Sequence, residues 1–364
     1  MNPFLELDAR DVLSVTRALI DCGSVSKHEE NLCDNLQEWL GSLRPDATFT
    51  RLQNNLIVQV NHGEGKKPIL LAGHIDTVPP AEFEGASNHK SRIVDDTLYG
   101  LGSADMKSGV AVMIALLADI KISSTFVFYE CEEIAEEFNG LRYIVNNSPE
   151  LLEASWAILL EPTDGQLEMG CQGSLTAKAR FVGKRAHSAR PWMGINAIHK
   201  ASKVLARAVE ESEAQPKVEI EGLTYTPALQ VTLIEGGVAA NVIPDSSVVT
   251  VNHRFAPDTS PEKAQAYVVD QVCAGADEVS ITSIAGGAMP AMDHPLVAFA
   301  KENGRQLVPK IGWTDVARFY WLDIPAVNCG PGDALLCHRA DEHIKIEKLN
   351  ETFEFLHDFI ATIE

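Results

Sequence analysis

The chain has 364 residues, of which 45% are hydrophobic and 22% are charged, a composition typical of a globular protein with room for two domains. Its formal charge of −21 argues against nonspecific binding to nucleic acid or to an anionic membrane surface. The seven cysteines form no CxxC spacing, which argues against a zinc ribbon and favours reduced thiols. The apolar segment 109–120 is too short to span a bilayer, and the N-terminus has no signal-peptide pattern. We expect a cytoplasmic protein.

The first half of the chain alternates apolar strands with helices. Residues 8–43 have helical periodicity. The segments that follow have the apolar patterns of strands, of a buried helix and of an amphipathic helix. The expected strands cover 55–60, 68–76, 124–133 and 156–165, and the expected helices cover 107–120 and 137–147. This alternation predicts an α/β fold, a parallel or mixed sheet with helices on both faces.

The pattern changes near residue 173. Segments 174–186 and 246–257 alternate apolar and polar residues, and helical stretches are expected near 195–212 and 261–274. Their order predicts an inserted α+β domain with a ferredoxin-like β-α-β-β-α-β arrangement and one open sheet face. We expect a discontinuous catalytic domain, 1–172 and 288–364, and an inserted lid or dimerisation domain, 173–287.

Acids and imidazoles follow the apolar strands of the first domain, where the chain leaves the sheet. Ligands of open α/β sheets collect at this edge, so we expect these side chains to meet. They are His74, Asp76, Asp105, Glu132, Glu133, Glu161 and His338. Several carboxylates brought together need a counter-charge, because their mutual repulsion raises their pKa values.

A pair of divalent metal ions would supply that counter-charge. Mixed nitrogen and oxygen ligands favour Zn²⁺, with Co²⁺ or Mn²⁺ as alternatives, over Mg²⁺ or Ca²⁺. His74 and Asp76 are two residues apart on one strand, so their side chains lie on the same side. Asp76 would then orient His74 as a metal ligand, since ligating histidines commonly donate their other N–H to a carboxylate.

The motifs "GHIDTVP", "GLGSADMKSG", "ECEE", "LLEPT" and "CHRADEH", in this order, resemble the zinc-dependent aminoacylase and carboxypeptidase family called M20. The resemblance covers essentially the whole chain and implies a zinc-peptidase-like catalytic domain. It implies that Glu132 is the general base, that Asp76 supports His74 and that Asp105 bridges two metals. The implied metal ligands are His74, Asp105, Glu133, Glu161 and His338. The chain departs from the family at Cys131, where the residue before the paired glutamates is commonly Asp.

The resemblance extends to the inserted domain. There "GKRAHSARPWMGINAI" resembles the segment whose histidine stabilises the tetrahedral oxyanion, often across a dimer, and this residue is His187. Asn241 and Arg254 match positions that grip the carboxylate end of the substrate, and Arg190 and Thr314 are expected to add contacts. The implied partners are a small anionic N-acyl amino acid and a second copy of the chain, a homodimer formed through the inserted domain.

The implied reaction is amide hydrolysis, with N-succinyl-LL-2,6-diaminopimelate as the expected substrate. N-acetylornithine, another N-acyl amino acid or a dipeptide is the alternative substrate within the same family. A catalytically silent binding protein with this fold is a further alternative, although the chain keeps all seven matching positions of the catalytic domain. A two-metal phosphatase would share carboxylates and histidines, but no phosphate-cradling glycine-rich loop supports it.

Overall fold

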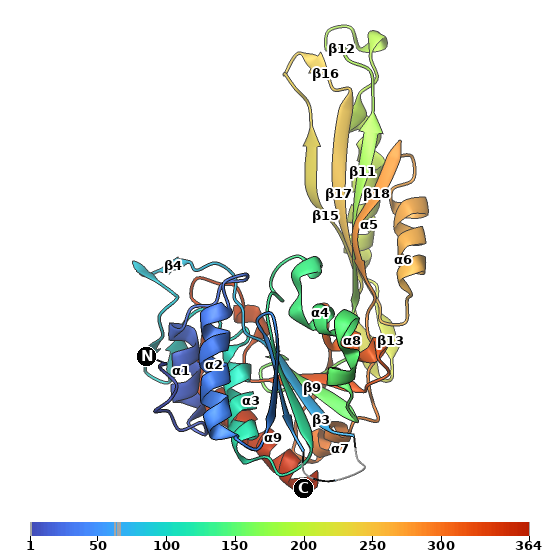
Figure 1. Ribbon diagram of the computed structural model, residues 1–364. Helices are drawn as coiled ribbons and strands as arrows, with labels where there is room; N and C mark the ends of the chain where they lie inside the picture. The colour runs from blue at the N-terminus through green and yellow to red at the C-terminus, as the bar shows by residue number, and fades with distance from the viewer. Residues whose placement is uncertain (1, 62, 64–66, 364) are drawn as a thin grey trace. The chain divides into compact units, whose positions relative to one another are not determined.

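The computed structural model describes residues 2–61, 63 and 67–363. The chain divides into two compact units, described separately (Figure 1). The first comprises residues 1–169, 291–308 and 318–364, and the second comprises 170–290 and 309–317. Segment 309–317 was expected in the catalytic domain, but it groups with the inserted unit. In the described part of the chain, no helix has both the length and the apolarity needed to cross a membrane.

The first unit contains an eight-stranded mixed sheet with the strand order β1-β2-β8-β3-β9-β20-β10-β19. Its strands are β1 (Thr48–Leu52), β2 (Asn55–Val60), β3 (Ile69–His74), β8 (Ser124–Tyr129), β9 (Trp156–Pro162), β10 (Leu167–Met169), β19 (Leu307–Pro309) and β20 (Ala326–Gly330). Smaller sheets contain β4 (Glu82–Phe83), β5 (Ala86–Ser87), β6 (Arg92–Val94), β7 (Thr97–Tyr99) and β21 (His343–Lys345).

The helices of this unit include the two that the periodicity of residues 8–43 predicts. They are α1 (Val12–Asp21), α2 (Glu30–Leu43), α3 (Lys107–Asp119), α4 (Gly140–Asn147), α7 (Pro295–Glu302), α8 (Val316–Trp321), which begins in the second unit, and α9 (Ile346–Ile363). Short 3₁₀ turns are η1 (Glu136–Phe138), η2 (Pro149–Leu152) and η5 (Ala334–Leu336).

The centre of the sheet is buried on both faces. Every residue of β3, β8 and β9 is buried, and β3 pairs in parallel with both neighbours. Helix α3 is buried from Lys107 to Leu117 and packs on these strands, which explains its apolar sequence on all sides. Gly109 allows this approach, because a Cβ there would collide with the carbonyl oxygen of Leu160 in β9. The start of α3 is therefore held at the carboxyl end of β9.

The second unit is a four-stranded antiparallel sheet with the order β15-β17-β11-β18 and two helices packed against it (Figure 1). Its main elements follow the predicted order: β11 (Gly173–Val182), α5 (Ala197–Ala214), β15 (Ala228–Gly236), β17 (Ser246–Phe255), α6 (Pro261–Tyr267) and β18 (Glu278–Ala285). The additional elements are β12 (Ala186–His187), η3 (Pro191–Met193), β13 (Val218–Ile220), β14 (Leu223–Tyr225), β16 (Val242–Ile243) and the π-helical turn η4 (Val268–Val272).

Alternation along β11 builds the core of this unit. Leu175, Ala177, Ala179 and Phe181 point inward and pack with the buried face of α5, while their neighbours are more exposed. The inserted α+β arrangement predicted from the sequence is confirmed, as is the mixed sheet of the first unit.

Candidate metal centre

Parallel strands bring the predicted ligands to one edge of the large sheet. His74 is the last residue of β3, and Glu133 follows the end of β8 by four residues. On the other side of β3, Ala72 pairs with Leu159 of β9, so His74 and Glu161 each lie two residues beyond that pair. The strand register thus places His74 and Glu161 at the same level, on strands about 4.8 Å apart.

Four of the predicted ligands contact one another directly. His74 Nε2 lies 3.0 Å from Asp105 Oδ1, and His338 Nε2 lies 3.5 Å from Asp105 Oδ2. His338 Nε2 also lies 2.8 Å from Glu133 Oε2. Ligand atoms of His74, Asp105 and Glu133 all lie within 4.8 Å of one another. Asp105 therefore sits between the two imidazoles, the position that a bridging carboxylate requires.

Glu161, the fifth predicted ligand, is linked to the other four by its effect on Cys337, the residue before His338. Its side chain is buried, and its charge acts on the thiol of Cys337, as do the charges of Asp105 and Glu342. Burial and these three carboxylates raise the pKa of Cys337 far above its usual range. Cys337 directly precedes His338 in the chain, so the carboxylates of Glu161 and Asp105 both act on the segment that contains His338.

Asp76 contacts His74 on the side of the ring away from Asp105. Nδ1 of His74 lies 3.4 Å from Asp76 Oδ1 and 3.2 Å from the Asp76 carbonyl oxygen, while Nε2 faces Asp105. Burial opposes ionisation of Asp76, but hydrogen bonds from His74, Ser26 and the Glu132 backbone hold its pKa below the usual value. The ring is thus fixed with Nε2 available to a metal.

The same carboxylate also holds the turn that carries the two glutamates. Asp76 Oδ1 accepts the backbone N–H of Glu132 at 3.0 Å, and Oδ2 accepts that of Glu133 at 3.2 Å. Cys131, which begins this turn, has φ of +56°. Two backbone donors at a carboxylate favour its ionised form. Asp76 therefore links the imidazole ligand to the segment that carries the predicted base.

Glu342 is a further acidic residue at the site that the sequence analysis did not identify. Its Oε1 accepts the backbone N–H groups of Ala104 at 2.9 Å and Asp105 at 3.1 Å. Burial raises the pKa of Glu342 to about 7, against the effect of these hydrogen bonds. Its only sequence signal is its place in "CHRADEH", four residues after His338. Glu342 thus holds the backbone of Asp105, the predicted bridging residue.

The electrostatics of the group fit a bound cation. Hydrogen bonds to Asp105 and Glu133 raise the pKa of His338 to about 10, although burial acts in the opposite direction. Burial also disfavours ionised Asp105, yet its bonds to His338 and His74 keep its pKa below the usual range. The hydrogen bonds between these groups thus favour protonated His338 and ionised Asp105. Imidazole nitrogens and carboxylate oxygens are donors that Zn²⁺, Co²⁺ and Mn²⁺ accept, so the residues fit such ions.

The predicted substrate residues all lie in the second unit, in two separate groups. His187 in β12 pairs with Val242 in β16, the N–H of Arg190 donates to the His187 carbonyl, and the N–H of Ser188 donates to the Asn241 carbonyl. We call His187, Arg190 and Asn241 the tip group. His187 and Arg190 are exposed.

Arg254 and Thr314 form the second group, which we call the base group. Thr314 is buried, and its carbonyl oxygen lies 3.8 Å from the thiol of Cys171. Arg254 in β17 pairs with Ser174 in β11, three residues after Cys171. In the described part of the chain, no acidic side chain pairs with the Arg254 guanidinium, and burial lowers its pKa. A half-buried guanidinium without a carboxylate partner is suited to an anionic ligand.

Strand β17 separates the two groups. Asn241 precedes this strand, which starts at Ser246, and Arg254 is near its end, about 26 Å further along. Asn241 and Arg254 were expected to grip one carboxylate together. Within one chain they are too far apart for that, because an extended strand holds them at its opposite ends.

Comparisons with known proteins show which family the chain resembles over its length. The family model of peptidase family M20/M25/M40 matches residues 70–362. A succinyl-diaminopimelate desuccinylase of Corynebacterium glutamicum is 38% identical, with 99% of each chain covered. An acetylornithine deacetylase of Vibrio cholerae is 28% identical, with 94% of this chain and 96% of that protein covered. The crystal structure of the aminopeptidase PepT of Bacillus cereus superposes with a TM-score of 0.77 at 21% identity, covering 98% of this chain and 99% of that one.

Proposed function

This chain belongs to peptidase family M20/M25/M40, and we propose that it is a metal-dependent amidohydrolase that cleaves N-succinyl-LL-2,6-diaminopimelate into succinate and LL-2,6-diaminopimelate. The observation that carries the reaction type is the contact network of His74, Asp105, Glu133 and His338 beside Glu132. The substrate rests on the near full-length similarity to the desuccinylase, which exceeds the similarity to the acetylornithine deacetylase.

His74, Asp105, Glu133, Glu161 and His338 would hold two divalent ions, with Asp105 between them and Zn²⁺ as the expected metal. When bound, such ions polarise the amide carbonyl and lower the pKa of a water molecule. Glu132 takes a proton from the attacking water and delivers it to the leaving amine. Asp76 keeps the His74 ring and the Glu132 backbone in place throughout.

The second unit supplies substrate recognition in this proposal. The guanidinium of Arg254 pairs with a substrate carboxylate, with Thr314 beside it, and His187 donates to the oxyanion that forms at the cleaved carbonyl. The length of β17 keeps the tip group away from the base group of the same chain. The two groups then act on one substrate when the tip group comes from a second copy of the chain.

Strand β15 is the natural surface for that second copy. It is an edge strand, and it carries the exposed apolar side chains of Leu233 and Ile234, 59% and 52% exposed. Unpaired strand edges with apolar side chains favour pairing with another chain. We propose a homodimer through β15. Seven free cysteines support a reducing cytoplasm as its location.

A substrate panel tests the function. Zinc-reconstituted protein is assayed with N-succinyl-LL-2,6-diaminopimelate, N-acetylornithine, other N-acyl amino acids and dipeptides. The highest kcat/KM is expected for the succinylated diamine, and a higher value for N-acetylornithine would reject the proposed substrate.

A mixing experiment tests the dimer. His187→Ala and Glu132→Gln are each expected to be nearly inactive, and mixed dimers should regain activity because one composite site is then intact. Mixtures no more active than the separate variants would exclude action across the dimer.

A further inference from the structure

We propose that Glu29 is a positioning residue, which fixes the turn that carries the general base Glu132 and the ligand Glu133. The inference rests on the proposed function for the roles of these two glutamates. Glu29 precedes α2, about a hundred residues before the turn, and none of the motifs in the sequence analysis includes it.

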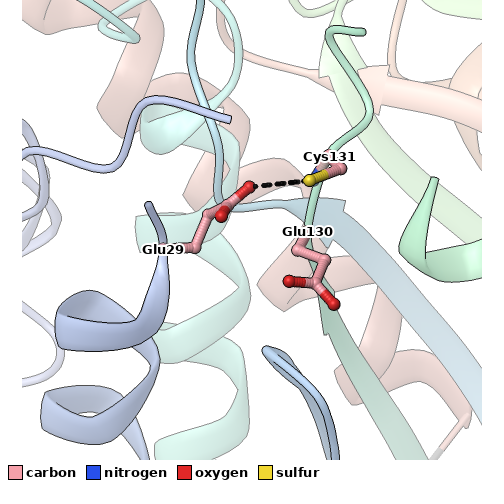
Figure 2. Close-up of side chains that lie close together, drawn as sticks. All are labelled: Glu29, Glu130 and Cys131. Atoms are coloured by element: carbon pink, nitrogen blue, oxygen red, sulfur yellow. Dashed lines mark hydrogen bonds between the residues drawn. The ribbon is translucent and has the colours of Figure 1, made fainter. Parts of the chain in front are cut away.

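Glu29 contacts the first residue of the turn with a single carboxylate oxygen. Its Oε1 accepts the backbone N–H of Cys131 at 3.1 Å and lies 3.3 Å from the Cys131 sulfur (Figure 2). The side chain of Glu29 is completely buried. The left-handed φ of Cys131 is unfavourable for a residue other than glycine, so it requires support from its surroundings. The two hydrogen bonds that Glu29 accepts from Cys131 provide that support.

Three consecutive backbone N–H groups of the turn are held by buried carboxylates. Cys131 donates to Glu29, and Glu132 and Glu133 donate to the two oxygens of Asp76. Every amide direction in this segment is therefore fixed from outside the strand. Loss of the hydrogen bond to Glu29 would free the Cys131 N–H. The backbone that leads into Glu132 would then be less well fixed.

The segment that carries Glu29 is itself bonded to Asp76 and Thr77, the residues that follow β3. The hydroxyl of Ser26 donates to Asp76 Oδ2 at 2.7 Å, and Val25 forms a β-bridge with Thr77. The carbonyl of Glu29 accepts the N–H of Cys33 in the first turn of α2. The segment from Val25 to Glu29 thus fixes the positions of the two carboxylates that hold the turn, those of Asp76 and Glu29.

The energetic cost of burying Glu29 indicates that its carboxylate serves a purpose. Its second oxygen, Oε2, is buried and has no hydrogen-bond partner among the described residues. A buried oxygen without a hydrogen-bond partner destabilises the folded protein, because nothing replaces the hydrogen bonds that it made to water. Stability alone does not explain a buried carboxylate at this position. Its role as the acceptor of the Cys131 N–H does explain it.

The neighbouring carboxylate of Glu130 does not take part in this contact. Its Oε1 accepts the N–H of Asn54 and the side-chain amide of Asn55, both at 3.2 Å. Figure 2 shows the carboxylate of Glu130 turned away from the thiol of Cys131, while Glu29 points toward it. Glu130→Gln therefore provides a matched control, which alters a buried carboxylate beside the turn and leaves the Glu29 contact intact.

The test compares Glu29→Ala, Glu29→Gln and Glu130→Gln with the wild type, all zinc-loaded. Hydrogen–deuterium exchange is measured for peptides that cover residues 129–135, and kcat and KM are measured with the best substrate of the panel. In Glu29→Ala we expect faster exchange confined to these peptides and a kcat about 10–100-fold lower with KM unchanged. Glu29→Gln keeps an acceptor oxygen, so its exchange rate and its kcat should lie close to those of the wild type. Glu130→Gln should match the wild type in both measurements.

Wild-type kcat and wild-type exchange in Glu29→Ala would overturn the proposal. Faster exchange throughout Glu29→Ala, without recovery in Glu29→Gln, would overturn it as well, because Glu29 would then serve general stability. Tight binding of a third zinc ion per chain, lost in Glu29→Ala, would make the cluster a metal site instead. If the wild type cleaves no substrate while the local exchange effect is present, the proposed function fails and the positioning of the turn stands.

Discussion

Nδ1 of His74 lies 3.4 Å from Oδ1 of Asp76, and both side chains are buried at the end of β3. The alternation of side chains along an extended chain brings them to the same side, and the contact leaves Nε2 of the ring directed at Asp105. In the proposed site, this contact would orient His74 as a metal ligand at the end of β3.

Replacement of Asp76 tests this relationship. Asp76→Ala removes the partner of the His74 ring and the acceptor of two backbone N–H groups, so we expect zinc affinity to fall about 10–100-fold. Competition with a chelator measures the change. Asp96→Ala, which removes an exposed carboxylate paired with Lys345, is the control and should keep wild-type affinity. An unchanged affinity in Asp76→Ala would contradict the orienting role.

Glu132→Gln should separate metal binding from proton transfer. The amide keeps the shape of the side chain but cannot take a proton from water, so turnover should fall about 10²–10⁴-fold while metal content stays at the wild-type value. Metal analysis and kcat measure the two effects. Glu137→Gln, an exposed neighbour, serves as the comparison. Retention of most of the rate in Glu132→Gln would remove the general-base assignment.

Glu133→Ala and His338→Ala should behave in the opposite way. Both residues are proposed metal ligands, and they contact each other at 2.8 Å, so loss of either should lower the metal occupancy of the protein. Metal content after gel filtration, compared with that of Glu132→Gln, checks this. Wild-type metal content in both variants would show that Glu133 and His338 are not metal ligands.

Arg254→Ala should weaken substrate binding without affecting the metal. A charged hydrogen bond to a carboxylate contributes about 1.5–3 kcal/mol, so we expect kcat/KM to fall about 10–150-fold, mainly through KM. Arg180→Ala in the same sheet removes a surface arginine paired with Glu278 and should change neither constant. A normal KM in Arg254→Ala would contradict recognition of the substrate by this residue.

His294 should give the protein a distinct acid sensitivity. Burial lowers its pKa from 6.5 to about 4, although its Nε2 contacts the Ala157 carbonyl oxygen at 3.1 Å. The unfolded chain therefore binds more protons than the folded one between these values, and stability falls as pH decreases from about 6.5 to 4. The total effect is roughly 3 kcal/mol.

The variant His294→Asn isolates this contribution. Asparagine can cap α7 as His294 does, but it does not titrate. The unfolding midpoint is measured against pH for both proteins in the presence of a chelator, so that the metal-site histidines contribute equally. The variant should lose less stability between pH 6.5 and 4, and parallel curves would reject the assignment.

Local patterns in the sequence determined much of the fold. The apolar runs 69–72 in β3 and 156–160 in β9 predicted buried strands, and the apolar segment after Lys107 predicted the buried helix α3, because burial on every side leaves no polar face. The positions of His74 and Asp105 at strand and helix boundaries predicted ligands at one sheet edge. Each of these signals lies within a few consecutive residues.

The tertiary structure decided what those local patterns do not contain. Glu29 and Glu342 act on the site through hydrogen bonds to the backbone of Cys131 and Asp105, which lie about 100 and 237 residues away in the chain. The distance between Asn241 and Arg254 depends on which strand lies between them, and segment 309–317 joins the second unit through contacts distant in sequence. A backbone amide is the same at every residue, so its acceptor leaves no mark in the sequence, and only the folded chain shows which carboxylate reaches it.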